Sequence, residues 1–117
     1  MKSVEAVIAL SALAHASRLE IFRLLVKRGP DGFTPGDLSQ KLDIPAPTLS
    51  FHLKELQRAR LIAVRRDGRF LHYSADFDSM NGLVGFLTEN CCSLGTVGCE
   101  TARAPPSTAS AQPRKRA

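Results

Sequence analysis

Residues 34–74 contain two short helical patterns followed by a turn between β-prone segments, an order that few small folds share. Thr34 followed by Pro35 is typical of a helix start, because threonine caps a helix and proline fits its first position. This helix should end near residue 42. A second helix is expected from Pro47 to about residue 60. Its leucines recur at i, i+4 and i+7, which places them on one buried side: Leu49, Leu53 and Leu56.

A basic hairpin is predicted directly after the second helix. Segments 61–66 and 69–74 are β-prone, and Asp67-Gly68 between them is a two-residue turn signal. Residues 54–69 carry six Lys and Arg against two acidic residues, whereas the rest of the chain up to residue 99 is slightly acidic when taken together. Such a basic surface favours a phosphate-bearing partner. The sequence therefore predicts a mainly α fold with a β-hairpin wing, a winged helix-turn-helix.

Three further helices are expected from apolar residues at helical spacing. The first covers residues 4–14, and the second begins after a cap at Ser17 and stops at Gly29. The third begins after a cap at Asp76 or Asp78 and runs to about residue 90. The first of them is expected to bury one side against another part of the chain.

One domain is expected from 117 residues, of which 44% are hydrophobic. We assign residues 1–92 to the winged helix-turn-helix domain and residues 93–117 to a cysteine-bearing loop and a disordered basic tail. The chain has no run of about 18 apolar residues, which excludes a membrane span. Ala14-His15-Ala16 superficially matches a secretory cleavage site, but Glu5 interrupts the leader pattern. We therefore expect a cytoplasmic chain with reduced thiols.

The side of the second helix opposite its leucines is expected to face double-stranded DNA. At about 100° per residue, that side and its flanks display hydroxyl, aromatic and cationic groups. Hydroxyls bond phosphates or base edges, Lys and Arg reach phosphates or guanine, and a phenyl ring touches a thymine methyl. Arginines of the hairpin would lie along the DNA backbone or enter the minor groove. The predicted DNA-binding residues are Pro47, Thr48, Ser50, Phe51, Lys54, Arg58, Arg65, Arg66 and Arg69.

The alternative for these residues is a solvated charged face on a small helical domain. The adjacency of two basic surfaces in an otherwise acidic body favours DNA binding over that alternative. The histidines are expected to be structural: His52 lies at the edge of the apolar side, and His15 and His72 have no partner at ligand spacing.

Three segments of the chain resemble the ArsR/SmtB family of metal-sensing bacterial repressors. They are Ala-Leu-Ala-His-Ala-Ser-Arg-Leu-Glu-Ile-Phe-Arg-Leu-Leu at 12–25, Leu-Ser-Phe-His-Leu-Lys-Glu-Leu at 49–56, and Asp-Gly-Arg at 67–69. The resemblance covers roughly residues 9–90, and its most specific piece is Ser-x-His-Leu-Lys in the second helix. It implies a homodimer that uses the first and last helices as its interface and places two helices in successive major grooves of an inverted repeat.

All three cysteines of the chain, Cys91, Cys92 and Cys99, lie within nine residues. Three thiolates without a fourth ligand suit an ion that prefers three sulfurs in a pyramid, such as As(III) or Sb(III), whereas zinc needs four ligands. Adjacent residues within a helix point about 100° apart, so one ion can bind both thiols only where the helix ends. Methylated arsenic, which needs two thiols, cadmium and lead remain alternatives. So do a disulfide switch and three functionally unrelated cysteines.

These observations predict a repressor of an arsenic-resistance operon that leaves its operator when As(III) or Sb(III) binds the three thiolates. The resemblance places the cysteines with arsenite-responsive members of the family, although the helix at 34–42 has no cysteine and the last helix lacks the histidines of the zinc-sensing site. An enzyme is not expected, because no Gly-rich phosphate loop accompanies a cysteine and no acid or base lies near the thiols. No organic cofactor, small-molecule substrate or membrane partner is expected.

Overall fold

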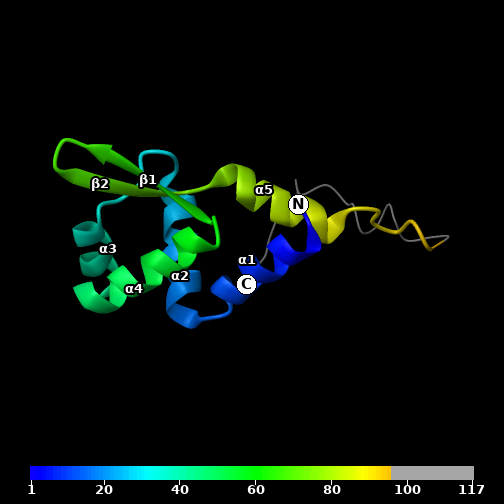
Figure 1. Ribbon diagram of the computed structural model, residues 1–117, viewed down its shortest axis with the longest axis horizontal. Coiled ribbons are helices and arrows are strands. Elements are labelled where there is room, and N and C mark those ends of the chain that lie inside the picture. The colour runs from blue at the N-terminus through cyan, green and yellow to red at the C-terminus, as the bar shows by residue number, and fades with distance from the viewer. Residues whose placement is uncertain (96–117) are drawn as a thin grey trace. The chain divides into compact units, whose positions relative to one another are not determined.

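The computed structural model describes residues 1–95, which form five helices and one two-stranded antiparallel hairpin (Figure 1). In chain order the elements are α1 (Ser3–Leu13), α2 (Ala16–Arg28), α3 (Pro35–Leu42), α4 (Ala46–Arg58), β1 (Ile62–Asp67), β2 (Phe70–Ala75) and α5 (Phe77–Thr88). The predicted mainly α fold with a hairpin wing is confirmed. Within the described residues, no helix is long and apolar enough to cross a membrane.

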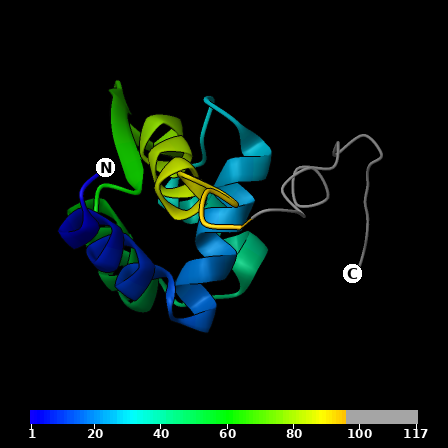
Figure 2. The same cartoon turned by 90° about the vertical axis from the view of Figure 1, so that its right-hand side faces the viewer.

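Contacts within the chain group Met1–Leu87 into one compact unit, and a second unit begins at Thr88. Within the first unit, α1 and α5 lie at the end opposite the hairpin tip (Figure 1). Seen from that end, they are the elements nearest the viewer (Figure 2). The predicted division at residues 92–93 stays a prediction, because the proposed tail falls almost entirely outside the described residues.

Helix starts follow the predicted capping chemistry in two of three cases. The Thr34 hydroxyl accepts a hydrogen bond from the Asp37 amide at 3.2 Å, and a carboxylate oxygen of Asp76 accepts one from the Ser79 amide at 3.1 Å. The predicted Ser17 cap is wrong, because α2 starts earlier. The imidazole of His15 caps that helix instead, accepting at Nδ1 from the Ser17 amide at 3.2 Å.

The core lies between α2, α3, α4 and the base of the hairpin, and α1 covers it with small residues. The predicted leucine side of α4 is buried, as are Ile21 and Leu25 of α2 and Leu38 of α3. Helix α1 buries only alanines: Ala6, Ala9 and Ala12. Leu13 is half-buried, whereas four other large apolar side chains of α1 are exposed in this chain: Val4, Val7, Ile8 and Leu10. Helix α1 therefore packs closely on one side and carries an exposed apolar surface on the other.

The hairpin pairs Ile62 with Ala75 at its base and Asp67 with Phe70 at its tip. Its two-residue turn is Gly68-Arg69, one residue later than predicted, because Gly68 supplies the positive φ of 64° at the first turn position. The base is tied to the α2–α3 connection: the Phe33 amide donates to the Tyr73 carbonyl at 2.9 Å, and the Tyr73 amide donates to the Phe33 carbonyl at 2.8 Å. The hairpin is thus attached to the helical body by main-chain hydrogen bonds.

Candidate nucleic-acid interface

Helix α4 presents opposite sides to the core and to solvent, as its leucine spacing predicts. Leu49, Leu53 and Leu56 are at most 3% exposed. The predicted DNA-binding residues of this helix are all exposed: Pro47, Thr48, Ser50, Phe51, Lys54 and Arg58. The chain therefore brings hydroxyl, aromatic and cationic side chains onto one accessible helical surface, which we call the exposed side of α4.

Local backbone features set where α4 starts and where the hairpin leaves it. Asp43 adopts a left-handed conformation with φ 55° and ends α3, and the Leu49 amide donates to the Pro45 carbonyl at 2.9 Å in the first turn of α4. At the other end, Arg60 has φ 65°, and the Leu61 amide donates to the Leu56 carbonyl at 3.1 Å. These two turns set how α3 is followed by α4 and how α4 is followed by the hairpin.

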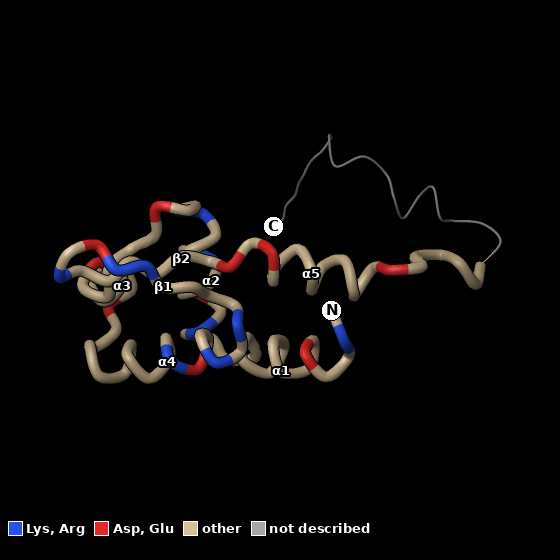
Figure 3. Tube along the Cα trace, turned by 45° about the horizontal axis from the view of Figure 1, so that its top comes forward, with Lys and Arg blue, Asp and Glu red and all other residues tan. Residues whose placement is uncertain are grey.

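The three predicted hairpin arginines, Arg65, Arg66 and Arg69, are exposed. Lys and Arg residues lie along both α4 and the hairpin (Figure 3). One of these arginines is anchored to the helical body, because Nη2 of Arg65 donates to the Asp31 carbonyl at 3.2 Å. A phosphate contact by Arg65 would therefore share or replace this hydrogen bond.

Arg58 forms an ion pair with Glu55 one turn earlier on α4, at 3.2 Å. The Arg58 side chain is 68% exposed, so solvent screens the pair and its contribution to stability is small. The Arg58 guanidinium is therefore available to a phosphate at low cost, while Lys54 supplies a second cation on the exposed side of α4.

His52 is buried, with 5% of its surface exposed, and its predicted structural role is confirmed. Its Nδ1 accepts a hydrogen bond from Nε of Arg18 in α2 at 3.2 Å, and its ring centre lies 4.7 Å from that of His15. Burial, and then the neighbouring His15 and Arg18, hold the pKa of His52 below its ordinary value of 6.5. Neither partner could be predicted from sequence, because both lie at the start of α2, far from His52 along the chain.

The thiols of Cys91 and Cys92 lie just beyond α5, where the backbone has left the helix. Asn90 and Cys92 have positive φ values of 58° and 64°. The two sulfur atoms are 3.5 Å apart. Two sulfurs that share one ion with bonds of about 2.3 Å cannot be more than about 4.6 Å apart, and this pair meets that limit. Cys99, the third predicted ligand, lies outside the described residues, among which no group of three or more potential metal ligands occurs.

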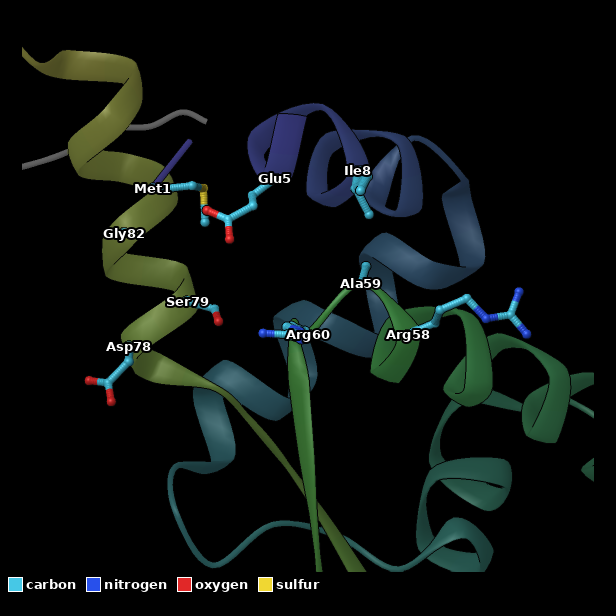
Figure 4. A pocket seen from close by; sticks show the side chains of 9 residues that line it. All are labelled: Met1, Glu5, Ile8, Arg58, Ala59, Arg60, Asp78, Ser79 and Gly82. Atoms are coloured by element: carbon cyan, nitrogen blue, oxygen red, sulfur yellow. The ribbon is translucent and has the colours of Figure 1, made fainter. Parts of the chain in front are cut away.

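A cavity of about 490 Å³ opens between α1, the α4–β1 turn and α5, and the sequence analysis did not anticipate it. Acidic and basic side chains line it together, with Glu5 and Asp78 opposite in charge to Arg58 and Arg60. Figure 4 shows the Arg58 side chain pointing away from Glu5 and Asp78. Among the described residues that line this cavity there is no thiol.

The chain is similar to a helix-turn-helix family and to known bacterial regulators. A family model described as a helix-turn-helix domain matches residues 13–65. The chain is 36% identical over 81 residues to the arsenical resistance operon repressor of Bacillus subtilis, covering 69% of this chain and 73% of that protein. It is 34% identical over 80 residues to the nodulation protein NolR of Rhizobium meliloti, covering 68% of this chain and 63% of that relative, which is less than two thirds of its length.

The fold has a counterpart among solved structures. An ArsR-like transcriptional regulator from Rhodococcus sp. RHA1 superimposes with a TM-score of 0.69, covering 93% of this chain and 96% of that one at 21% identity. At that identity, the likeness supports the winged helix-turn-helix fold alone.

Proposed function

The chain belongs to the ArsR/SmtB-type family of DNA-binding transcriptional repressors, and from that membership we propose that it represses an arsenic-resistance operon. Capture of As(III) or Sb(III) by the thiolates of Cys91, Cys92 and Cys99 would release it from operator DNA. The observation that carries the proposal is the 3.5 Å separation of the Cys91 and Cys92 sulfur atoms directly after the last helix. The similarity to an arsenical resistance operon repressor supports a role in arsenic resistance.

In this proposal the exposed side of α4 enters the major groove. Thr48 and Ser50 bond phosphate or base edges, Phe51 touches a thymine methyl, and Lys54 and Arg58 reach phosphates or guanine. The hairpin arginines lie along the DNA backbone. The supporting observation is that every one of these side chains is exposed on α4 or on the hairpin that follows it.

A homodimer is part of the proposal, because an operator with two half-sites requires two copies of α4. Exposed apolar side chains on α1 and α5 support it: Val4, Val7, Ile8 and Leu10 on α1, and Val84 and Leu87 on α5. A second copy of the chain would cover these side chains. Ion capture beyond α5 would then change the packing of that helix in the dimer and the separation of the two α4 helices.

The experiment is fluorescence anisotropy of the reduced protein on an inverted-repeat operator from upstream of its own gene, titrated with arsenite at fixed salt. We expect release at one ion per protomer, with roughly 5- to 150-fold weaker binding, the range of a typical single-site coupling. Cys91→Ser, Cys92→Ser and Cys99→Ser should each retain operator binding and lose the response, whereas Ser93→Ala, a matched control without a thiol, should keep both.

Other outcomes separate the alternative inducers. Release by methylarsenite but not arsenite, with Cys99→Ser unaffected, would replace the three-thiol site by a two-thiol site. Release by peroxide alone would assign the cysteines to redox control. A cysteine variant that lost operator binding as well as the response would contradict the separation of sensing from DNA contact.

A further inference from the structure

Arg18 of α2 contacts two consecutive residues of α4 that differ sharply in exposure. Its Nε donates to Nδ1 of His52 at 3.2 Å, and its Cζ lies 5.6 Å from the centre of the Phe51 ring. His52 is 5% exposed, whereas Phe51 is 54% exposed. One guanidinium therefore holds the buried side of α4 and at the same time packs on an aromatic ring of its exposed side.

His15 extends this contact to the start of α2. Its ring centre lies 4.7 Å from that of His52, and its own Nδ1 accepts from the Ser17 amide at 3.2 Å. An imidazole nitrogen that accepts a hydrogen bond carries no proton. In this arrangement Nδ1 of His52, which accepts from Arg18, is therefore unprotonated.

We propose that Arg18 and His52 are positioning residues for DNA binding, which hold α4 and Phe51 in their binding orientation only while His52 is neutral. The proposal rests on the DNA interface proposed above. A protonated imidazole has no acceptor, so protonation of His52 removes the Arg18 hydrogen bond and sets two cations against each other. Phe51 then loses the guanidinium on which it packs, and operator affinity falls on acidification without any metal ion.

Two neighbouring groups lower the pKa of His52 in addition to burial, first His15 and then Arg18. His15, the N-cap of α2, and Arg18 within α2 face it. The α1 residues that share a cavity with Arg18 are uncharged: Val7, Ile8, Ser11 and Ala12. On α4 itself, Glu55 is paired with Arg58. On α3, Lys41 lies over the Phe33 ring at 5.5 Å, and on β1, Arg65 donates to the Asp31 carbonyl.

The direction of the pH effect follows from the lowered pKa of His52. The unfolded chain takes up this proton near the ordinary value of 6.5, while the folded chain takes it up only at lower pH. Folding is therefore fully supported by this group above pH 6.5 and less so as pH falls through the folded-state pKa. Operator binding, which needs the same neutral imidazole, should weaken in the same direction.

The test measures operator anisotropy from about pH 7.5 to about pH 5 for the full chain and its variants. Wild type should lose about tenfold in affinity across this range. His52→Asn keeps an acceptor near the position of Nδ1 but cannot be protonated, so it should bind within about threefold of wild type at pH 7.5 and show no acid step. His72→Asn is the matched control, and it should retain the acid step.

A second pair of variants tests the guanidinium. Arg18→Ala should weaken binding about tenfold at pH 7.5, and Arg18→Lys should restore only part of it, because an ammonium lacks the planar fork. Arg23→Ala removes an equal charge from an exposed position of α2 and should bind as wild type does. An acid step that survives in His52→Asn, or equal losses in Arg18→Ala and Arg23→Ala, would overturn the proposal.

Nitrogen NMR of the histidine rings in the free protein provides a readout that needs no DNA. His52 should carry its proton on Nε2 and titrate below pH 6.5, and Arg18→Ala should move its midpoint upward, because a cation and a donor are lost. An unchanged midpoint would contradict the contact itself. Failure of wild type to bind any operator at pH 7.5 would instead overturn the proposed function, while the ring titration would still decide the Arg18–His52 pair.

Discussion

Gly32 and Gly68 both have positive φ, but they differ in what surrounds them. At Gly32 (φ 72°) an added Cβ would clash with the Tyr73 carbonyl oxygen, whereas at Gly68 (φ 64°) nothing lies within 4 Å. Gly32 therefore serves the close approach of the α2–α3 connection to β2, and Gly68 serves the turn geometry alone. A side chain would therefore be strained by the positive φ at both positions, but it would also meet a steric conflict at Gly32.

We predict that Gly32→Ala lowers the free energy of unfolding by about 3 kcal/mol, since Tyr73 must move in addition to the backbone strain. Gly68→Ala, the matched control, should cost only about 1 kcal/mol, the penalty of a left-handed conformation. Urea unfolding followed by circular dichroism measures both. Equal losses would mean that the Phe33–Tyr73 attachment tolerates the extra methyl group.

Helix α4 carries its structural and proposed DNA-contacting residues on different sides. Leu49, Leu53 and Leu56 could be placed from sequence because a helix of known start repeats every 3.6 residues. The exposure of Phe51 could be predicted for the same reason. Its contact with Arg18 could not be predicted. The sequence therefore predicts which side of α4 is buried and which is exposed. It does not predict the contacts that α4 makes with α2.

Removing Lys54 should weaken operator binding about tenfold at all ion concentrations and reduce the slope of log affinity against log salt by about 1, as expected for one phosphate contact. Lys54→Ala leaves the core intact, because the side chain is exposed. Anisotropy titrations at three salt concentrations measure the slope, with Lys27→Ala in the last turn of α2 as the control. An unchanged slope would remove Lys54 from the proposed interface.

The hairpin also has features that the sequence predicts and features that it does not. Its two strands were predicted within a residue of their observed bounds, because β-prone runs and a Gly-containing turn are local signals. The turn lies at Gly68-Arg69 instead of Asp67-Gly68, since the pairing of Asp67 with Phe70 sets the register. Its attachment through Phe33 has no sequence signal, because main-chain hydrogen bonds do not depend on side-chain type.

At the scale of the whole molecule, a single chain leaves the apolar side of α1 exposed to solvent. Val7 and Ile8 are 58% and 51% exposed, and exposed apolar clusters of this kind mark interfaces. Helix α5 lies at the same end of the compact unit (Figure 2) and contributes Val84. A dimer through these helices would bury side chains that the chain itself does not cover.

We predict that Val7→Glu converts the protein from dimer to monomer, because a carboxylate in an apolar interface is costly to desolvate. Sedimentation velocity measures the change, and operator binding should weaken with it. Phe70→Glu, at an equally exposed apolar residue of the hairpin tip, should leave the sedimentation coefficient unchanged. A wild-type chain that sediments as a monomer at all concentrations would contradict the proposed dimer.

The sequence by itself determined the elements, the leucine side of α4, the exposure of its opposite side and the Thr34 cap. Each of these depends on residues within about four positions of one another, where spacing and capping chemistry act directly. Only the tertiary structure decided that His15 caps α2, that alanines of α1 cover the core, and that Arg18 bonds His52. The last contact joins residues 34 positions apart, so it exists only after packing has brought α2 against α4.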